Sequence, residues 1–116
     1  MKNFLLKTCL FLALLLVIRS VSANVSLVVL GDSLSAGYGL SQEQTWVAEL
    51  DRRWESSHPD INIINASISG ETTRGGLRRL EGVLERHKPD ALFIELGGND
   101  GLRGFDLNKV RSSLKQ

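Results

Sequence analysis

Cysteine is almost absent from this chain, with Cys9 as the only one among 116 residues. A single thiol cannot close an internal disulfide, so packing and hydrogen bonds must hold the fold together. Cys9 also lies inside an apolar run near the N-terminus rather than after it, which argues against a lipid-attachment site. The sequence therefore excludes a small scaffold held together by disulfides.

Several ligand-binding motifs are missing as well. No cluster of His, Cys and carboxylate residues has the spacing of a metal site, so we expect neither a metal nor another cofactor. No Gly-Lys-Ser/Thr phosphate loop is present, and no Gly-x-Gly-x-x-Gly opens a helix. Without its first 23 residues the chain has a formal charge of −2, and no basic patch for nucleic acid remains. These absences direct attention to side-chain chemistry on a small-molecule substrate.

Residues 1–23 are typical of a secretory signal peptide. Lys2 and Lys7 precede an apolar run over residues 8–18, and Val21-Ser22-Ala23 places small residues before an expected cleavage site. Cleavage there would remove three cations, change the formal charge from +1 to −2, and leave no stable membrane anchor. An uncleaved anchor is the alternative, but the run is short for a bilayer and Arg19 interrupts its end. We expect a periplasmic or secreted protein.

The remaining residues, 24–116, are expected to form one domain of alternating strands and helices. Three runs rich in apolar or β-branched residues are predicted strands: 25–30, 61–64 and 91–96. Helices are predicted at about 42–57, from 72 or 73 up to Pro89, and after Asp106, which can cap the last one. This alternation favours an α/β fold, a flavodoxin-like three-layer α/β/α parallel sheet. The flavodoxin-like order of the three strands is 2-1-3.

The segment Gly31-Asp32-Ser33-Leu34-Ser35 directly follows the first predicted strand and begins a small-residue loop that ends at Gly39. A serine there lies at the carboxyl end of a parallel strand, where active sites collect and helix N-termini supply oriented N–H groups. Ser33 is therefore the candidate nucleophile. The alternative is that Asp32, Ser33 and Ser35 only satisfy hydrogen bonds of the turn.

Two further loops, 65–70 and 97–101, also leave the carboxyl ends of predicted strands. In the order 2-1-3 they would lie on either side of the Ser33 loop. An acyl-transfer nucleophile needs donors aimed at the oxygen that becomes negative, and the Ser33 N–H, the Gly70 N–H and the Asn99 amide could supply three. Taken alone, Gly70 also fits a turn glycine and Asn99 an Asx turn.

Together these segments resemble the first three sequence blocks of the GDSL or SGNH hydrolases. Longer stretches, 29–39 and 95–104, are similar to the esterases, thioesterases, lysophospholipases and arylesterases of that family, and the resemblance covers about residues 25–116. It implies the SGNH-hydrolase fold, and an acyl-enzyme formed when Ser33 attacks an acyl ester or thioester. It also implies oxyanion donors at Ser33, Gly70 and Asn99, with Asp32 and Asp100 in supporting roles.

The family's remaining block, an Asp-x-x-His that supplies the orienting carboxylate and the general base, has no counterpart in these 116 residues. His58 precedes Pro59 and is expected in a surface linker, and His87 is expected in the last turn of a helix. We therefore expect an N-terminal portion of such an enzyme that is catalytically incomplete. A noncatalytic acyl- or carbohydrate-binding remnant and an oligosaccharide deacetylase of the same family remain the alternatives.

Overall fold

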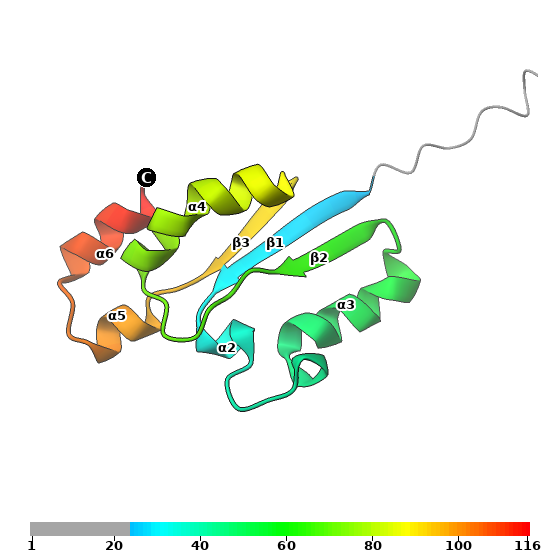
Figure 1. Ribbon diagram of the computed structural model, residues 1–116, viewed down its shortest axis with the longest axis horizontal. Coiled ribbons are helices and arrows are strands. Elements are labelled where there is room, and N and C mark those ends of the chain that lie inside the picture. The colour runs from blue at the N-terminus through cyan, green and yellow to red at the C-terminus, as the bar shows by residue number, and fades with distance from the viewer. Residues whose placement is uncertain (1–23) are drawn as a thin grey trace, which may run out of the picture.

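The computed structural model describes residues 24–116, and the expected signal peptide lies outside them. Three parallel strands form one sheet in the order β2-β1-β3: β1 is Val25–Gly31, β2 is Ile61–Asn65 and β3 is Ala91–Glu95. Each strand end lies within one residue of its predicted position. The expected strand order is confirmed, and it brings the carboxyl ends of all three strands to one edge of the sheet (Figure 1).

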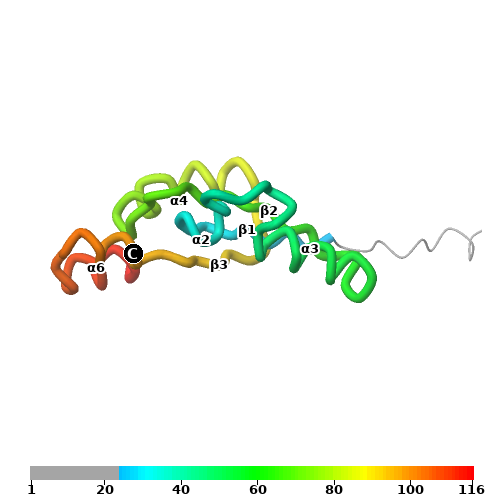
Figure 2. The backbone as a smooth tube through the Cα atoms, turned by 90° about the horizontal axis from the view of Figure 1, so that it is seen from below, coloured from blue at the N-terminus to red at the C-terminus, as the bar shows by residue number. Residues whose placement is uncertain are grey.

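Two long helices run antiparallel to the strands and pack on opposite faces of the sheet. Helix α3, Trp46–Ser57, connects β1 to β2, and helix α4, Thr73–His87, connects β2 to β3. Because β2 and β3 lie on opposite sides of β1, right-handed crossovers require the two helices to lie on opposite faces. Figure 2 shows α6, Leu107–Leu114, beyond the carboxyl end of β3, and α3 toward the other end. The three-layer α/β/α architecture is confirmed.

The hydrophobic core lies between the sheet and α4. Val28 and Leu30 of the central strand are buried and pack with Val83 of α4. Glycine at position 76 allows α4 to lie close to Leu96, because a Cβ at this position would overlap the Leu96 side chain. The half-buried apolar side chains around this cluster are Ile64, Ala66, Leu80, Leu92 and Leu96. The opposite face carries an edge-to-face pair between Trp46 and Phe93, whose ring centroids are 5.9 Å apart.

The helix predicted at 42–57 is wrong at its start. A 3-10 turn at Gln42–Gln44 is followed by Thr45 in an extended conformation, with φ of −71° and ψ of 152°, and α3 begins only at Trp46. The Thr45 hydroxyl caps α3 by accepting from the Ala48 N–H at 3.1 Å. A second helix-capping residue therefore lies inside the predicted helix and interrupts it.

Two segments predicted as loops form short helices. Ser33–Ala36 is the one-turn helix α2, and Gly98–Leu102 is helix α5. The predicted cap at Asp106 is confirmed, because its carboxylate accepts from the Asn108 N–H at 2.7 Å. None of the helices within residues 24–116 is long and apolar enough to cross a membrane.

Strand β3 lies at the edge of the sheet and pairs only with β1 among residues 24–116. Phe93 and Ile94 point to opposite faces of this strand, and 48% and 45% of their surfaces are exposed. The edge strand therefore presents both unpaired backbone groups and apolar side chains.

Candidate active site

Ser33 is the first residue of α2, and only Asp32 separates it from the end of β1. Asp32 caps this helix by accepting from the Leu34 N–H at 3.0 Å, and Gly37, with φ of 77°, ends it after one turn. A side chain at Gly37 would be strained by the positive φ and would overlap Thr45. The result is a sharp turn from strand to helix that presents the half-buried Ser33 at the carboxyl edge of the sheet.

Ser35 anchors this turn from the interior. Its side chain is fully buried, and its hydroxyl donates to Glu95 Oε2 at 2.9 Å and accepts from Trp46 Nε1 at 3.2 Å. The Ser35 carbonyl accepts from Asn65 Nδ2 at 2.7 Å. Contacts from β2, β3 and α3 therefore fix the one-turn helix that carries Ser33.

The loop after β2 is bonded to the end of β1. The Ile68 N–H donates to the Gly31 carbonyl and the Gly31 N–H donates to Ser67 Oγ, both at 3.0 Å. Gly70 has φ of +80°, a conformation that disfavours other residues, and its carbonyl accepts from Arg103 at 3.0 Å. The loop is therefore held close to the strand that leads to Ser33.

Asn99, in the first turn of α5, connects the other two segments. Its Nδ2 donates to Asp32 Oδ2 at 3.2 Å and to the Glu71 carbonyl at 2.9 Å, so it contacts the neighbours of both Ser33 and Gly70. Both amide hydrogens are used in these bonds, and a substrate oxyanion would have to take one of them.

Unlike the Asn99 amide, the two predicted backbone donors are not already hydrogen-bonded within the part of the chain that the structure describes. Within residues 24–116, the N–H groups of Ser33 and Gly70 have no protein acceptor. Backbone N–H groups usually find a partner unless water or a ligand meets them. The structure thus brings the segments carrying all three predicted donors to one edge of the sheet (Figure 1), with two N–H groups unpaired.

Asp100, the second residue assigned a supporting role, joins α5 to α4. Its carboxylate is buried and accepts from both the backbone N–H and the hydroxyl of Thr73, each at 2.8 Å. Asp100 therefore fixes the helix that carries Asn99 against the first turn of α4. Each oxygen of this buried carboxylate therefore has a hydrogen-bond donor.

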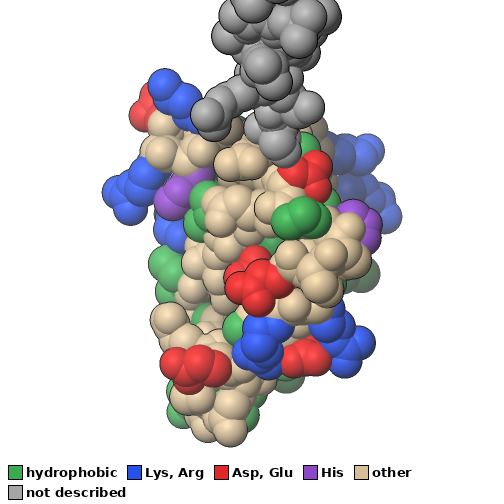
Figure 3. Space-filling view, turned by 90° about the vertical axis from the view of Figure 1, so that its right-hand side faces the viewer, with side chains coloured by type: hydrophobic (Ala, Val, Ile, Leu, Met, Phe, Trp, Pro, Cys, Tyr) green, Lys and Arg blue, Asp and Glu red, His purple; other side chains and the backbone are tan. Residues whose placement is uncertain are grey.

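Both histidines lie far from Ser33. His58 ends α3 and His87 lies in the last turn of α4, so both are at the amino-terminal edge of the sheet. A strand of five to seven residues is roughly 17–23 Å long, which separates these imidazoles from the carboxyl edge. Figure 3 shows this opposite end of the molecule, with histidine side chains at its surface. Within residues 24–116, no group of three or more His, Cys, Asp or Glu side chains could hold a metal ion.

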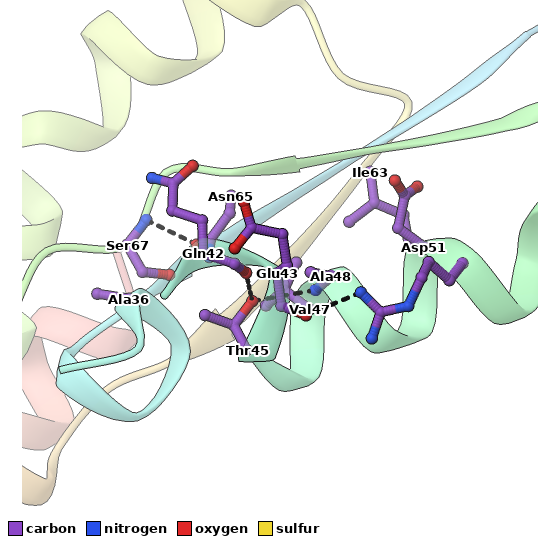
Figure 4. Close-up of a pocket in the computed structure, with 11 residues that line it drawn as sticks. Ala36, Gln42, Glu43, Thr45, Val47, Ala48, Asp51, Ile63, Asn65 and Ser67 are labelled. Atoms are coloured by element: carbon purple, nitrogen blue, oxygen red, sulfur yellow. Dashed lines mark hydrogen bonds between the residues drawn. The ribbon is translucent and has the colours of Figure 1, made fainter. Parts of the chain in front are cut away.

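A hollow of about 610 Å³ opens beside the nucleophile turn, between α3 and the end of β2 (Figure 4). Ala36 and Ser67 line it where it approaches the site, and Arg52, which also lines it, donates to the Glu43 carbonyl at 2.8 Å. Neither Ser33, Gly70 nor Asn99 lines this hollow. The candidate site is therefore defined by its hydrogen-bond donors and not by the volume of this cavity.

The sequence analysis did not identify the residues that hold the segments of the site in place. Glu95 was assigned only to a strand, and Glu71 and Arg79 received no role at the site. A carboxylate inside the otherwise apolar run 91–96 is a usable signal, because a buried charge needs a partner. No such signal marks Arg79, which is one of four arginines in α4.

Comparisons with known proteins bear on the same segments. Residues 29–116 match the GDSL-like Lipase/Acylhydrolase family. The chain is 45% identical over 106 residues to Thioesterase 1/protease 1/lysophospholipase L1 of Escherichia coli strain K12, an alignment that covers 91% of this chain and 50% of that protein. It is 46% identical over 114 residues to Esterase TesA of Pseudomonas aeruginosa, with coverage of 98% and 55%.

A solved esterase structure is similar to this chain in both fold and sequence. The psychrotrophic esterase EstA from Pseudoalteromonas sp., in a structure inhibited by monoethylphosphonate, superimposes with a TM-score of 0.74 at 52% identity. The alignment covers 77% of this chain and 49% of that one. The chain therefore spans about half the length of the relatives that it matches.

Proposed function

Because the chain belongs to the GDSL-like lipase/acylhydrolase family, we propose that the protein hydrolyses acyl esters or thioesters through an acyl-enzyme on Ser33. One observation carries the proposal: Ser33 begins a one-turn helix at the sheet edge that also holds the loop of Gly70 and the helix of Asn99, and Asn99 bonds to the neighbours of both Ser33 and Gly70. Relatives named as thioesterase, lysophospholipase and esterase support this substrate class.

In the proposed reaction, Ser33 Oγ attacks the carbonyl carbon and the carbonyl oxygen becomes negative. That oxygen would accept from the N–H groups of Ser33 and Gly70 and from Asn99, and each such donor is typically worth ~3 kcal/mol of barrier. Collapse of the tetrahedral intermediate expels the alcohol or thiol and leaves an acyl group on Ser33, which water then removes as the free acid. Preorganised donors of this kind stabilise the transition state more than the bound ester.

The hydroxyl proton of Ser33 must pass to a base in the first step. Neither histidine of residues 24–116 is placed to take it, because both lie at the opposite edge of the sheet. Without an imidazole, a serine hydroxyl is a weak nucleophile at neutral pH, and oxyanion donors alone give only residual catalysis. The proposal therefore requires a base outside these two histidines.

The test uses the protein at its full natural length, treated with a fluorophosphonate and assayed on a p-nitrophenyl ester and an acyl thioester. We expect mass spectrometry to find the label on Ser33, and Ser33→Ala to abolish both labelling and turnover. Ser69→Ala is the matched control, because Ser69 is exposed on the neighbouring loop and should leave both unchanged. Label on another serine would overturn the assignment.

Two other outcomes would replace the proposal. Binding of a fatty acyl ligand without labelling or turnover would favour a noncatalytic acyl-binding protein. Acetate release from an acetylated oligosaccharide, without turnover of longer acyl esters, would favour a deacetylase.

Export is part of the same proposal. The basic and apolar pattern of residues 1–23 and the small residues at 21–23 support a cleaved signal peptide and a periplasmic or secreted enzyme that acts on small acyl substrates. Intact-mass measurement of the protein from the periplasmic fraction should give a chain that begins at Asn24. An unprocessed chain retained in the membrane fraction would contradict this.

A further inference from the structure

Arg79 of α4 contacts both ends of the loop that carries Gly70. Its Nη2 donates to the Ala66 carbonyl at 3.0 Å, where the loop begins, and its Nε donates to Glu71 Oε2 at 2.7 Å, just after Gly70. The guanidinium group is planar and holds its N–H donors in fixed directions. One side chain therefore sets the separation between the two ends of the loop.

This contact is built into the fold. The Arg79 and Glu71 side chains are only 28% and 12% exposed, whereas ion pairs that contribute little are usually open to solvent. The other oxygen of the Glu71 carboxylate accepts from the Thr72 N–H at 3.2 Å, at the start of α4. A Cβ at Gly75 would overlap this carboxylate, so the first turn of α4 has room for Glu71 only because position 75 is glycine.

Glu71 also reaches the third candidate donor. Its backbone carbonyl accepts from Asn99 Nδ2 at 2.9 Å, while its side chain is bonded to Arg79. A shift of Glu71 would therefore change both the loop next to the Gly70 N–H and the acceptor that orients the Asn99 amide. The two donors come from different segments, the loop after β2 and helix α5, and the Arg79–Glu71 pair links them.

We propose that Arg79 and Glu71 are positioning residues that hold the Gly70 N–H and the Asn99 amide at the spacing needed for the oxyanion. The inference rests on the proposed function, since it concerns the transition state of ester hydrolysis. Neither side chain touches the reacting atoms, and both act through the loop. Donors of this kind stabilise the transition state because they are already oriented, and a misplacement of about 1 Å can lower the rate about 10²-fold.

The experiment compares Arg79→Met with Arg78→Met in the protein at its full natural length. Arg78 is the neighbouring exposed arginine of α4 and makes no hydrogen bond or ion pair to any of residues 24–116. We expect Arg79→Met to lower kcat on a p-nitrophenyl ester about 10- to 100-fold with KM within about threefold, because the donors act in the transition state. Arg78→Met should change neither constant by more than about twofold.

Three further variants separate positioning from general stability. Arg79→Lys should restore only part of kcat, because an ammonium group cannot supply the same fixed pair of donors. If Arg79→Met is unfolded at the assay temperature, Glu71→Gln gives the test, with an expected fall in kcat of about 3- to 10-fold. In the Asn99→Ala background, Arg79→Met should cost less than it costs alone, since part of its effect passes through Asn99.

The outcomes distinguish this inference from the proposed function. If the unsubstituted protein neither labels at Ser33 nor turns over esters, the proposed function fails and the inference fails with it. If Ser33 is labelled and active but folded Arg79→Met matches Arg78→Met, the positioning role alone is overturned. Fully additive effects of Arg79→Met and Asn99→Ala would also overturn the link between the two donors.

Discussion

Alanine in place of Gly31 should destabilise the protein at the point where the nucleophile turn meets the sheet. Gly31 is the last residue of the central strand and is buried. A Cβ there would lie 2.8 Å from both Cβ and Oγ of Ser35 and 2.9 Å from Glu95 Oε2. Carbon atoms do not pack at such distances, so Ser35 or Glu95 must move.

The size of the effect follows from those contacts. Overpacking of a buried site typically costs about 1–3 kcal/mol. Ser35 also donates to the Glu95 carboxylate at 2.9 Å, and a hydrogen bond to a charged group contributes about 1.5–3 kcal/mol when it is lost. Because a partial shift relieves some of each term, we expect Gly31→Ala to lower the free energy of unfolding by roughly 2–4 kcal/mol.

Gly82→Ala is the matched control and should have the opposite sign. Gly82 lies inside α4, is exposed, and a Cβ there would meet nothing within 4 Å. Replacing glycine by alanine inside an exposed helix raises stability by about 0.5–1 kcal/mol, because the unfolded chain loses less entropy.

Urea unfolding followed by circular dichroism measures both changes in the protein at its full natural length. The rate of fluorophosphonate labelling at Ser33 should fall for Gly31→Ala, since Ser35 anchors the helix that carries Ser33. If Gly31→Ala is as stable as the unsubstituted protein and Ser33 reacts at the same rate, the packing argument for this turn is refuted.

Three other predictions address catalysis, association and pH. Asn99→Ala should lower kcat about 10²- to 10³-fold without unfolding the protein, and unchanged turnover would remove Asn99 from the mechanism. Residues 24–116 expressed alone should be inactive and should self-associate through the exposed edge at Phe93 and Ile94. Light scattering measures this association, and Ile94→Lys should reduce it. A monomeric fragment that melts cooperatively and turns over esters would contradict the prediction. Hydrogen bonds from Arg53 and Arg52 lower the pKa of Glu49 in the folded protein. Its ion pairs therefore stabilise α3 fully at pH values above the unfolded carboxyl pKa of 4.5, and this stabilisation is lost as the pH falls through the lower folded pKa. Glu49→Gln should therefore flatten the acid limb of the stability curve slightly, and an identical limb would refute the assignment.

The sequence alone was sufficient for features set by neighbouring residues. The cap at Asp106 was predicted from local pattern because capping depends on residues only a few positions apart. The β-branched and apolar runs located the strands, and their alternation with helices predicted a parallel sheet, whose crossovers are right-handed. The order 2-1-3 was expected from the flavodoxin-like arrangement, and it is the order that the structure has. Ser33 could be selected because the carboxyl end of a parallel strand is where loops and helix N-termini meet.

Local pattern failed where two local signals compete. Ser41 and Thr45 both suit a helix start, and only packing decided that α3 begins after Thr45. The glycines at 97, 98 and 101 predicted a loop, yet residues 98–102 are helical, because the buried Asp100 side chain bonds to Thr73 of α4. That contact spans 27 residues of sequence and leaves no trace in local composition.

The support of the site was decided by the tertiary structure alone. Ser35 meets Glu95 sixty residues away, Asn99 meets Asp32 sixty-seven residues away, and Arg79 closes the loop of Gly70 from a different helix. The sequence by itself determined which residue types could carry acyl transfer and at which strand ends they lie, because those depend on local geometry and strand order. Which side chains hold them in place depends on contacts between distant segments, and these exist only once the sheet and its helices have packed.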